Sequence, residues 1–271
     1  VTLNKSGTST QTISGATFYN LTLDNTTAAT TSSKTLANAC TILGAVIIGN
    51  GGAGISQLAT GSYDLYVAGN WTNNCVGGLS SSGTISLNGT TGTQTIAGTQ
   101  SSAFNILVLS GAAAKTINTS QLVNADLQFS STSGTVTLAA AATITDGGGN
   151  NTFTIAGSTA FIVLGTFPSV FETVSLSAGS TVRYQANGAQ NVYAVASPGY
   201  GNLQVYANTN GTATTKTALG DLYIQTGITI GNGGTDNNVT LNMNNNSMYL
   251  SGSTFTQQTG APQVSWGTGT M

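Results

Sequence analysis

The sequence predicts an all-β protein, and within that class a β-solenoid, in which the chain coils into stacked short parallel strands. Landmarks return in the same order three times along the 271 residues, and repetition at this scale is typical of solenoids and arrays. Many apolar residues are β-branched or aromatic and stand in short runs broken by Gly, Asn and Ser. No long window carries the apolar stripe of a helix, so we expect no helix longer than about two turns.

Each copy opens with a strand-like segment followed by a Gln-containing segment. Val1-Thr2-Leu3-Asn4 and Thr10-Gln11-Thr12-Ile13 return as residues 85–88 with 93–96, and again as 182–185 with 190–192. A last echo is Val264-Ser265-Trp266-Gly267. The copies therefore span residues 1–84, 85–181 and 182–263, and residues 264–271 begin a fourth.

The second landmark predicts which side chains face the core. Residues 18–23, 104–109 and 200–205 each start with an aromatic residue and end with apolar residues two apart, the period of a strand with one buried face. We expect the three copies to place equivalent residues inward: Leu21, Leu107 and Leu203, and likewise Leu23, Leu109 and Val205. The rings of Phe18, Phe104 and Tyr200 need a corner to pack inward. A Lys-Thr pair follows in every copy, at Lys34, Lys115 and Lys216.

Two architectures fit these strands. In a solenoid, each copy forms about four rungs of roughly 20-odd residues. In the alternative, each copy is a separate β-sandwich domain. The solenoid is favoured because no Pro-rich or charged linker divides the copies and the chain holds only three Pro.

Composition limits the function. Charged residues are 4%, the net charge is −2, and five Lys and Arg cannot form a nucleic-acid surface. No apolar run is long enough to span a bilayer. Val1 is not an initiator residue, so we expect a processed chain or a piece of a longer one.

Catalytic chemistry is not expected. The chain has no His, which removes the Ser-His-Asp arrangement and the commonest metal ligand. Its seven acidic residues are isolated in sequence. The Gly-rich turns at 146–149 and 231–236 faintly resemble calcium-binding β-roll loops, but their spacing differs, and Gly and Asn at corners explain them better. We therefore expect a non-enzymatic protein with no catalytic, cofactor or metal site.

Two kinds of covalent modification are candidates. Cys40 and Cys75 could form a disulfide or stay as buried thiols. Asn-x-Ser/Thr sequons could carry glycans on exposed turns. The candidate positions are Asn4, Asn25, Asn70, Asn88, Asn118, Asn150, Asn210, Asn238 and Asn245.

The opening landmarks, together with Val67-Ala68-Gly69-Asn70-Trp71-Thr72, resemble the repeat regions of long secreted bacterial surface proteins, the filamentous adhesin-like chains. The third copy departs most, with Tyr184 where the first has Leu3, and no Asn-Trp-Thr after Gly252. The resemblance implies a parallel β-helix and a structural role that is extracellular or at the cell surface. It brings no catalytic residue.

We therefore expect a segment or subunit of a surface filament, stalk or adhesin. It would assemble end to end through Val1 and Leu3 at one end and Val264 and Trp266 at the other, with surface glycans as a second class of partner. One alternative is a carbohydrate-binding or carbohydrate-cleaving β-helix, which needs carboxylates clustered in a groove with aromatic residues. The other is an ice-binding solenoid, which needs Thr-x-Thr pairs aligned on one flat face. Such pairs occur at 10–12, 93–95, 135–137, 143–145 and 152–154.

Overall fold

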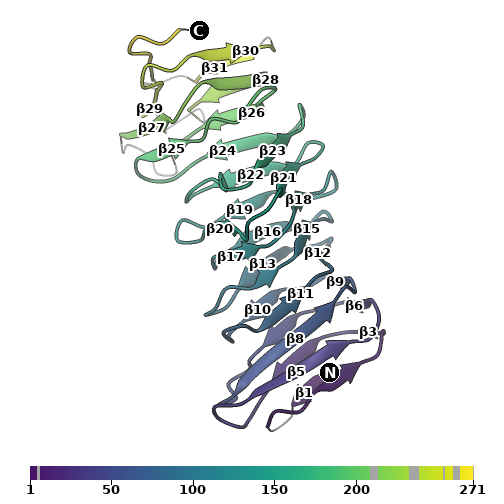
Figure 1. Cartoon of the computed structure of the whole chain (residues 1–271). Helices are drawn as coiled ribbons and strands as arrows, with labels where there is room; N and C mark the ends of the chain where they lie inside the picture. The colour runs from purple at the N-terminus through teal and green to yellow at the C-terminus, as the bar shows by residue number, and fades with distance from the viewer. Residues whose placement is uncertain (5–6, 208–212, 232–237, 253, 259–262, 271) are drawn as a thin grey trace.

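The chain winds into a single parallel β-solenoid of about 11 turns, with no helix among the residues that the structure describes (Figure 1). These are residues 1–4, 7–207, 213–231, 238–252, 254–258 and 263–270 of a computed structural model. The two ends of the chain lie at opposite ends of the coil (Figure 1). The predicted fold class is confirmed, and the sandwich alternative is excluded because the strands pair across turns throughout.

Stacked strands form three faces. Face one is a 13-stranded sheet: β1 (Thr2–Asn4), β4 (Leu21–Asp24), β7 (Val46–Ile48), β10 (Trp71–Asn73), β13 (Thr93–Ala97), β16 (Ala114–Ile117), β19 (Val136–Leu138), β22 (Ala160–Val163), β24 (Thr181–Tyr184), β26 (Tyr200–Val205), β28 (Leu222–Ile230), β30 (Met248–Leu250) and β31 (Thr254–Gln257). The long strand β28 pairs with both β30 and β31.

Face two is an eight-stranded sheet, and its strands run along one edge of the view in Figure 1: β3 (Thr17–Phe18), β6 (Cys40–Ile42), β9 (Leu65–Val67), β12 (Thr84–Leu87), β15 (Ile106–Leu109), β18 (Leu127–Phe129), β21 (Thr152–Ile155) and β23 (Thr173–Leu176).

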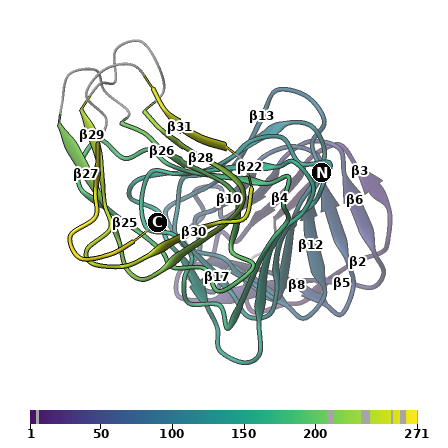
Figure 2. The ribbon, with the colours of Figure 1, turned by 90° about the horizontal axis from the view of Figure 1, so that it is seen from above.

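Face three is divided into three smaller sheets. They contain β2 (Gln11–Ile13), β5 (Thr31–Leu36), β8 (Ile55–Gly61) and β11 (Leu79–Ser81); then β14 (Ala103–Phe104), β17 (Gln121–Val123) and β20 (Ile144–Asp146); then β25 (Gln190–Val192), β27 (Thr214–Ala218), β29 (Val239–Asn242) and β32 (Gln263–Ser265). Seen along the axis, the two ends of the coil do not superpose, so the stack is not a straight prism (Figure 2).

Strand register gives the length of a turn. Leu3 lies opposite Leu23, which lies opposite Ile48, so these turns take 20 and 25 residues. Ile96 lies opposite Ile117, which lies opposite Leu138, and both steps are 21 residues. The expected rung of 20-odd residues therefore holds in these turns.

The sequence copies do not open on the same face. Four complete turns of three strands would take 12 strands, but the first copy contains only 11, β1 to β11. The second copy therefore begins at β12, on face two instead of face one. The third opens at β24 on face one. Leu21, Leu107 and Leu203 all point inward and are fully buried. However, Leu107 is on face two and the other two are on face one, so their predicted equivalence holds for direction but not for position.

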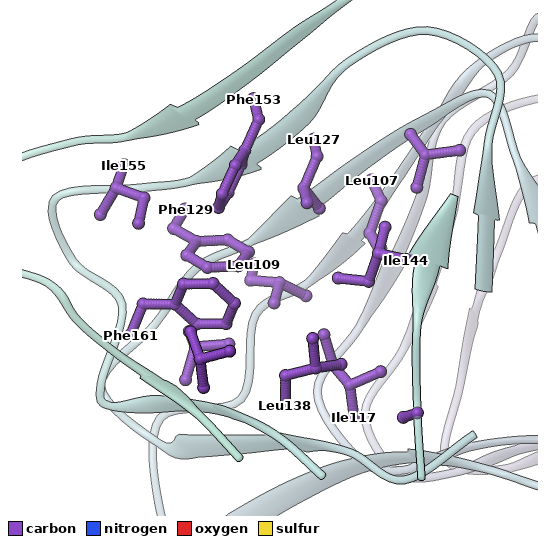
Figure 3. Packing of buried hydrophobic residues seen from close by; sticks show 14 of the residues in the cluster. Leu107, Leu109, Ile117, Leu127, Phe129, Leu138, Ile144, Phe153, Ile155 and Phe161 are labelled. Carbon is purple, nitrogen blue, oxygen red and sulfur yellow. The ribbon is translucent and has the colours of Figure 1, made fainter. Parts of the chain in front are cut away.

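The interior is a continuous apolar column (Figure 3). In the middle of the coil, Leu107, Leu109 and Leu127 pack beside the rings of Phe129, Phe153 and Phe161. These three rings meet edge to face, with centroids 5.1 to 5.7 Å apart, an arrangement that aromatic quadrupoles favour.

The recurring aromatic residues pack inward through corners, as predicted. Phe104 is buried in β14, and the corner at Asn105 separates it from β15. Tyr200 is buried because β26 shifts register between Tyr200 and Asn202. Phe18 is half-buried in the first turn and packs against the core.

Candidate functional site

The Lys of each Lys-Thr pair lies inside the solenoid. Lys34, Lys115 and Lys216 are no more than 1% exposed. Each stacks directly on a Gln of the preceding turn, in the pairs Gln11 with Lys34, Gln94 with Lys115 and Gln190 with Lys216. We call each such pair a Gln–Lys corner. Each copy therefore contributes one corner, although the corners lie on different faces.

In the second copy, main-chain atoms surround the Gln–Lys corner. The Lys115 Nζ donates to the carbonyl oxygens of Ala113 at 2.8 Å, Gly111 at 3.0 Å and Gly89 at 3.4 Å. The Gln94 Oε1 accepts from the Gly89 N–H at 3.1 Å, and its Nε2 donates to the carbonyl of Val67 in the turn below at 2.7 Å. One corner residue, Gly89, thus binds both side chains and ties successive turns together.

The third copy repeats this arrangement. Ala186 takes the place of Gly89: its N–H donates to Gln190 Oε1 at 3.1 Å, and its carbonyl accepts from Lys216 Nζ at 2.7 Å. Lys216 also donates to the carbonyl of Gly188 at 2.8 Å, and Gln190 to that of Val163 at 2.9 Å. The same side-chain pair therefore makes the same bonds on two different faces.

The first copy holds only half of the arrangement. Lys34 Nζ donates to the Asp24 carbonyl at 2.7 Å and to Ser32 Oγ at 3.1 Å. The Oε1 of Gln11 is buried, yet no hydrogen-bond partner for it exists among the described residues. In the other copies this oxygen accepts from a corner N–H five or four residues before the Gln; of the corresponding residues here, Ser6 lies outside the described residues and the Gly7 N–H donates to Thr27 Oγ1 at 3.0 Å. Gln11 also lies in the first turn, so no turn below supplies the carbonyls to which the Nε2 of Gln94 and Gln190 donates.

Burial lowers the pKa of Lys115 and of Lys216 to about 8. Burial also lowers the pKa of Lys34, against a smaller opposing effect of Asp24. A Lys side chain with a pKa near 8 could act as a base or nucleophile. These amines, however, face carbonyl oxygens and are buried from solvent. We therefore assign the Gln–Lys corners a structural role: their hydrogen bonds fix the register between adjacent turns.

Most of the acidic residues bind the backbone of the next turn. Asp64, Asp126 and Asp221 accept the N–H of Thr84, Thr152 and Ser247, at 3.0, 3.0 and 2.8 Å. Asp24 accepts from Gly52 N–H at 3.0 Å, and Asp146 from Gly148 N–H at 3.2 Å. Glu172 is exposed, and Asp236 lies outside the described residues. The described residues contain no cluster of three or more His, Cys, Asp or Glu that could hold a metal ion.

The Gly-rich turn at 146–149 is a structural corner. Gly148 and Gly149 have φ values of 94° and 112°, which side-chain-bearing residues rarely adopt. Asp146 Oδ1 accepts from Asn151 Nδ2 within the same corner. The other Gly-rich turn, at 231–236, falls mostly outside the described residues.

The Thr-x-Thr pairs are divided among the faces. The pairs at 93–95 and 135–137 lie on face one, those at 10–12 and 143–145 on face three, and that at 152–154 on face two. On face one, Thr95, Thr116 and Thr137 do stack in successive turns, but Ile162 and Arg183 continue the column. This arrangement does not favour an ice-binding face.

Sequence reasoning missed one aromatic pair, the half-buried Tyr223 and the exposed Tyr249. Tyr223 and Tyr249 stack face to face, with centroids 4.8 Å apart and planes at 10°. Their spacing in sequence, one turn of about 26 residues, is the only signal that could have linked them, and it needs the register of β28 and β30.

The two cysteines do not pair in the structure. Both thiols are free and buried. Cys40 Sγ donates to the Ala16 carbonyl at 3.1 Å, and Cys75 Sγ accepts from the Ser56 N–H at 3.4 Å. Of the two alternatives for these residues, the structure contains the buried thiols.

The sequons differ in accessibility. Asn25 is fully buried and its Nδ2 donates to the carbonyls of Thr30 and Ile55, so it cannot accept a glycan in the folded chain. Asn88 and Asn238 are half-buried, and Asn210 lies outside the described residues. The remaining sequons are exposed: Asn4, Asn70, Asn118, Asn150 and Asn245. Asn70 and Asn245 already accept backbone N–H groups of the next turn through Oδ1.

The residues expected at the assembly surfaces lie in the two terminal turns. Leu3 packs against the core at one end, while Val264 and Trp266 do so at the other, and Val1 is exposed. However, β1 is on face one and β32, which contains Val264, is on face three. β31 lies on the same face as β1, and β32 on the same face as β2, so a stack that continues the faces would bring β31, rather than the Val264 segment, to the opening strand.

None of the described residues forms a helix long and apolar enough to cross a membrane. Comparison with family models, with curated proteins and with solved structures gives no match.

Proposed function

We propose that this protein is a non-enzymatic structural element of an extracellular or cell-surface filament, stalk or adhesin, and that it stacks end to end. The resemblance of its repeats to those of secreted bacterial surface proteins supports the location. A nearly uncharged coil with an uninterrupted apolar column also suits a stiff rod.

The observation that carries the proposal is the state of the two terminal turns. At one end β1, β2 and β3, and at the other β31 and β32, are the outermost strands of their faces. An outermost strand presents N–H and C=O groups to which another strand can pair.

Stacking would pair β31 of one subunit with β1 of the next, and β32 with β2. Such a contact does not close on itself, so it gives a filament rather than a dimer. A longer chain that continues the same coil would use the same contacts within one molecule.

A variant of β1 tests the proposal. The Val1 carbonyl accepts from the Thr22 N–H, so alternation along a parallel strand turns the Thr2 N–H toward the open end. Thr2→Pro removes that donor and leaves the ladder with β4 intact, while Thr2→Val keeps it. Sedimentation velocity should show large assemblies for Thr2→Val and a folded monomer for Thr2→Pro; equal assembly of both would refute end-to-end pairing through β1.

The carbohydrate-active alternative gains no support, because five of the seven carboxylates serve as backbone acceptors in separate corners.

A further inference from the structure

Face two is interrupted above β23. Its eight strands end there, and residues 193–199, the next stretch of chain on that side, form no strand. Pro198 lies within this stretch and has no N–H to contribute to a ladder. Faces one and three continue past this level through β24 to β27, so one rung of face two is missing.

The missing rung leaves a groove of about 400 Å³. All four residues of β23, Thr173–Leu176, line one side of it, and Tyr193, Ala194 and residues 196–199 line the other. The groove therefore runs along the edge of a sheet.

The backbone of β23 offers unused hydrogen-bonding groups to the groove. The N–H groups of Thr173 and Ser177 donate to the turn below, to Asn151 at 3.2 Å and Ile155 at 2.9 Å. In a parallel strand, alternate residues point to opposite edges, so the main-chain groups of Val174 and Leu176 face the groove. The Leu176 carbonyl confirms this direction, because Gln225 Nε2 reaches it at 3.0 Å.

Gln225 fills only one end of the gap. Its Nε2 also donates to the Gly199 carbonyl at 2.9 Å, and thus bridges the two walls where a strand would otherwise lie. Among the described residues, β23 pairs with no strand except β21, so no ladder engages the N–H and C=O of Val174 or the N–H of Leu176.

The side chains around the groove form an apolar floor and an acidic rim, which favour a ligand with alternating apolar and polar side chains. Val174 faces inward but is only half-buried, whereas the inward-facing Phe153 and Ile155 of β21 are fully buried. Phe171 and Tyr193 complete this apolar floor. Glu172 is exposed at the rim, one residue before β23 begins.

We propose that this groove binds an extended peptide, which adds a parallel strand to the free edge of β23. The peptide would place a small apolar side chain over Val174 and a basic side chain beside Glu172. Strand addition of this kind obtains affinity from main-chain hydrogen bonds and specificity from alternate side chains. The four residues of β23 span about 13 Å at roughly 3.3 Å per residue, so three or four peptide residues fill the edge. A sugar cannot present alternating N–H and C=O groups at this spacing.

The test uses the purified chain and the synthetic peptide acetyl-Lys-Thr-Val-Ser-amide, with amide hydrogen exchange measured by NMR. At a peptide concentration of about four times Kd, exchange at the Val174 and Leu176 amides should slow about fivefold, because only the bound state is protected. The amides of Thr173 and Ser175, already in the ladder with β21, should not change. Unchanged exchange at Val174 and Leu176, or equal protection by a neutral cello-oligosaccharide, would overturn the proposal.

Two variants separate this site from a general surface effect. Val174→Pro removes the N–H that faces the groove and should abolish the protection of Leu176, whereas Val174→Ala keeps the N–H and should preserve it. If Val174→Pro does not fold, N-methylation of the peptide's Ser amide, which would donate to the Val174 carbonyl, removes a backbone donor from the ligand side instead and should weaken binding. Glu172→Gln should weaken binding of the Lys peptide severalfold. Undiminished binding to the Pro variant or of the N-methyl peptide would contradict strand addition. End-to-end assembly is independent of this groove and should be unaffected.

Discussion

A buried Lys is held in this fold by main-chain oxygens. Among the described residues, the Lys115 ammonium has three carbonyl neighbours and the Lys216 ammonium has two. Desolvation of the charge opposes folding, while loss of the ammonium would leave converging carbonyls without a donor. The Gln and Lys side chains bind the corners of successive turns. If a strand slipped by one residue, its Gln or Lys would point outward to solvent and lose these bonds. The Gln–Lys corners thus specify register.

Replacing the buried ammonium should destabilise the chain. In Lys115→Met the carbonyls of Gly111 and Ala113 lose their donor, which we expect to cost about 2 kcal/mol, since an orphaned buried polar group costs roughly 1–3 kcal/mol. Urea unfolding measures this, with Thr116→Ser, an outward-facing neighbour, as the control. A Met variant as stable as the parent chain would show that the corner contributes no net stability.

The same residues give a pH dependence. The folded pKa of Lys115 and Lys216 is about 8, below the ordinary 10.5, so the unfolded chain binds more protons between these values. Stability from these two residues therefore rises with pH through this window. Burial raises the pKa of Cys40, Tyr184 and Tyr200. Stability from these three residues therefore falls as the pH rises near and above their ordinary pKa values.

The readout is therefore the difference between the parent chain and Lys115→Met in unfolding free energy, measured from pH 7.5 to about pH 9.5. We expect the cost of the substitution to grow as the pH rises, because the parent gains stability that the variant lacks. A difference that is constant or shrinks with pH would mean that the amine is not desolvated in the folded chain.

At the scale of the element, each strand buries alternate side chains and the corners join the faces. Leu107 is fully buried in β15, while its neighbour Val108 is half-buried and points outward. Asp and Asn residues at the corners accept N–H groups from the following turn, which spaces the turns without side-chain charge pairs. Alternation along the strand thus sets which side chains are buried, and hydrogen bonds at the corners hold each turn against the next.

Leu107→Ala should cost about 2–5 kcal/mol, the usual range for a buried Leu. The outward Val108→Ala should cost well under half as much. Thermal unfolding of the two variants compares neighbours in one strand; a larger loss from Val108→Ala would invert the assigned direction of β15.

The sequence predicts local features of these elements but not their placement. Alternation identified Leu21, Leu107 and Leu203 as inward because the period of a strand is local. It could not assign Leu107 to face two, because the face of a strand depends on how many strands precede it. Turns vary in length, so the sequence does not give that number. The buried lysines also escaped prediction, since charge alone suggests exposure. A signal was present: Lys34, Lys115 and Lys216 each stand two residues before a buried apolar residue, on the same side of the strand. The groove beside β23 arises from a missing strand, which no motif marks.

At the scale of the whole molecule, the coil carries little charge. With 4% charged residues, contacts between terminal turns would consist of backbone pairing and apolar burial. Assembly should therefore change little between low salt and about 1 M salt, because screening acts on charges. Light scattering across this range checks the expectation, and dissolution of the assemblies by salt would contradict it.

Imaging of the purified chain by electron cryo-microscopy tests the proposed end-to-end assembly most directly. About 11 turns at roughly 4.8 Å per turn give a subunit repeat of about 53 Å along the axis. We predict unbranched filaments that show both spacings, with single coils as the shortest particles. Single coils at every concentration, or fibrils that show the 4.8 Å spacing without the longer repeat, would contradict end-to-end stacking of folded subunits.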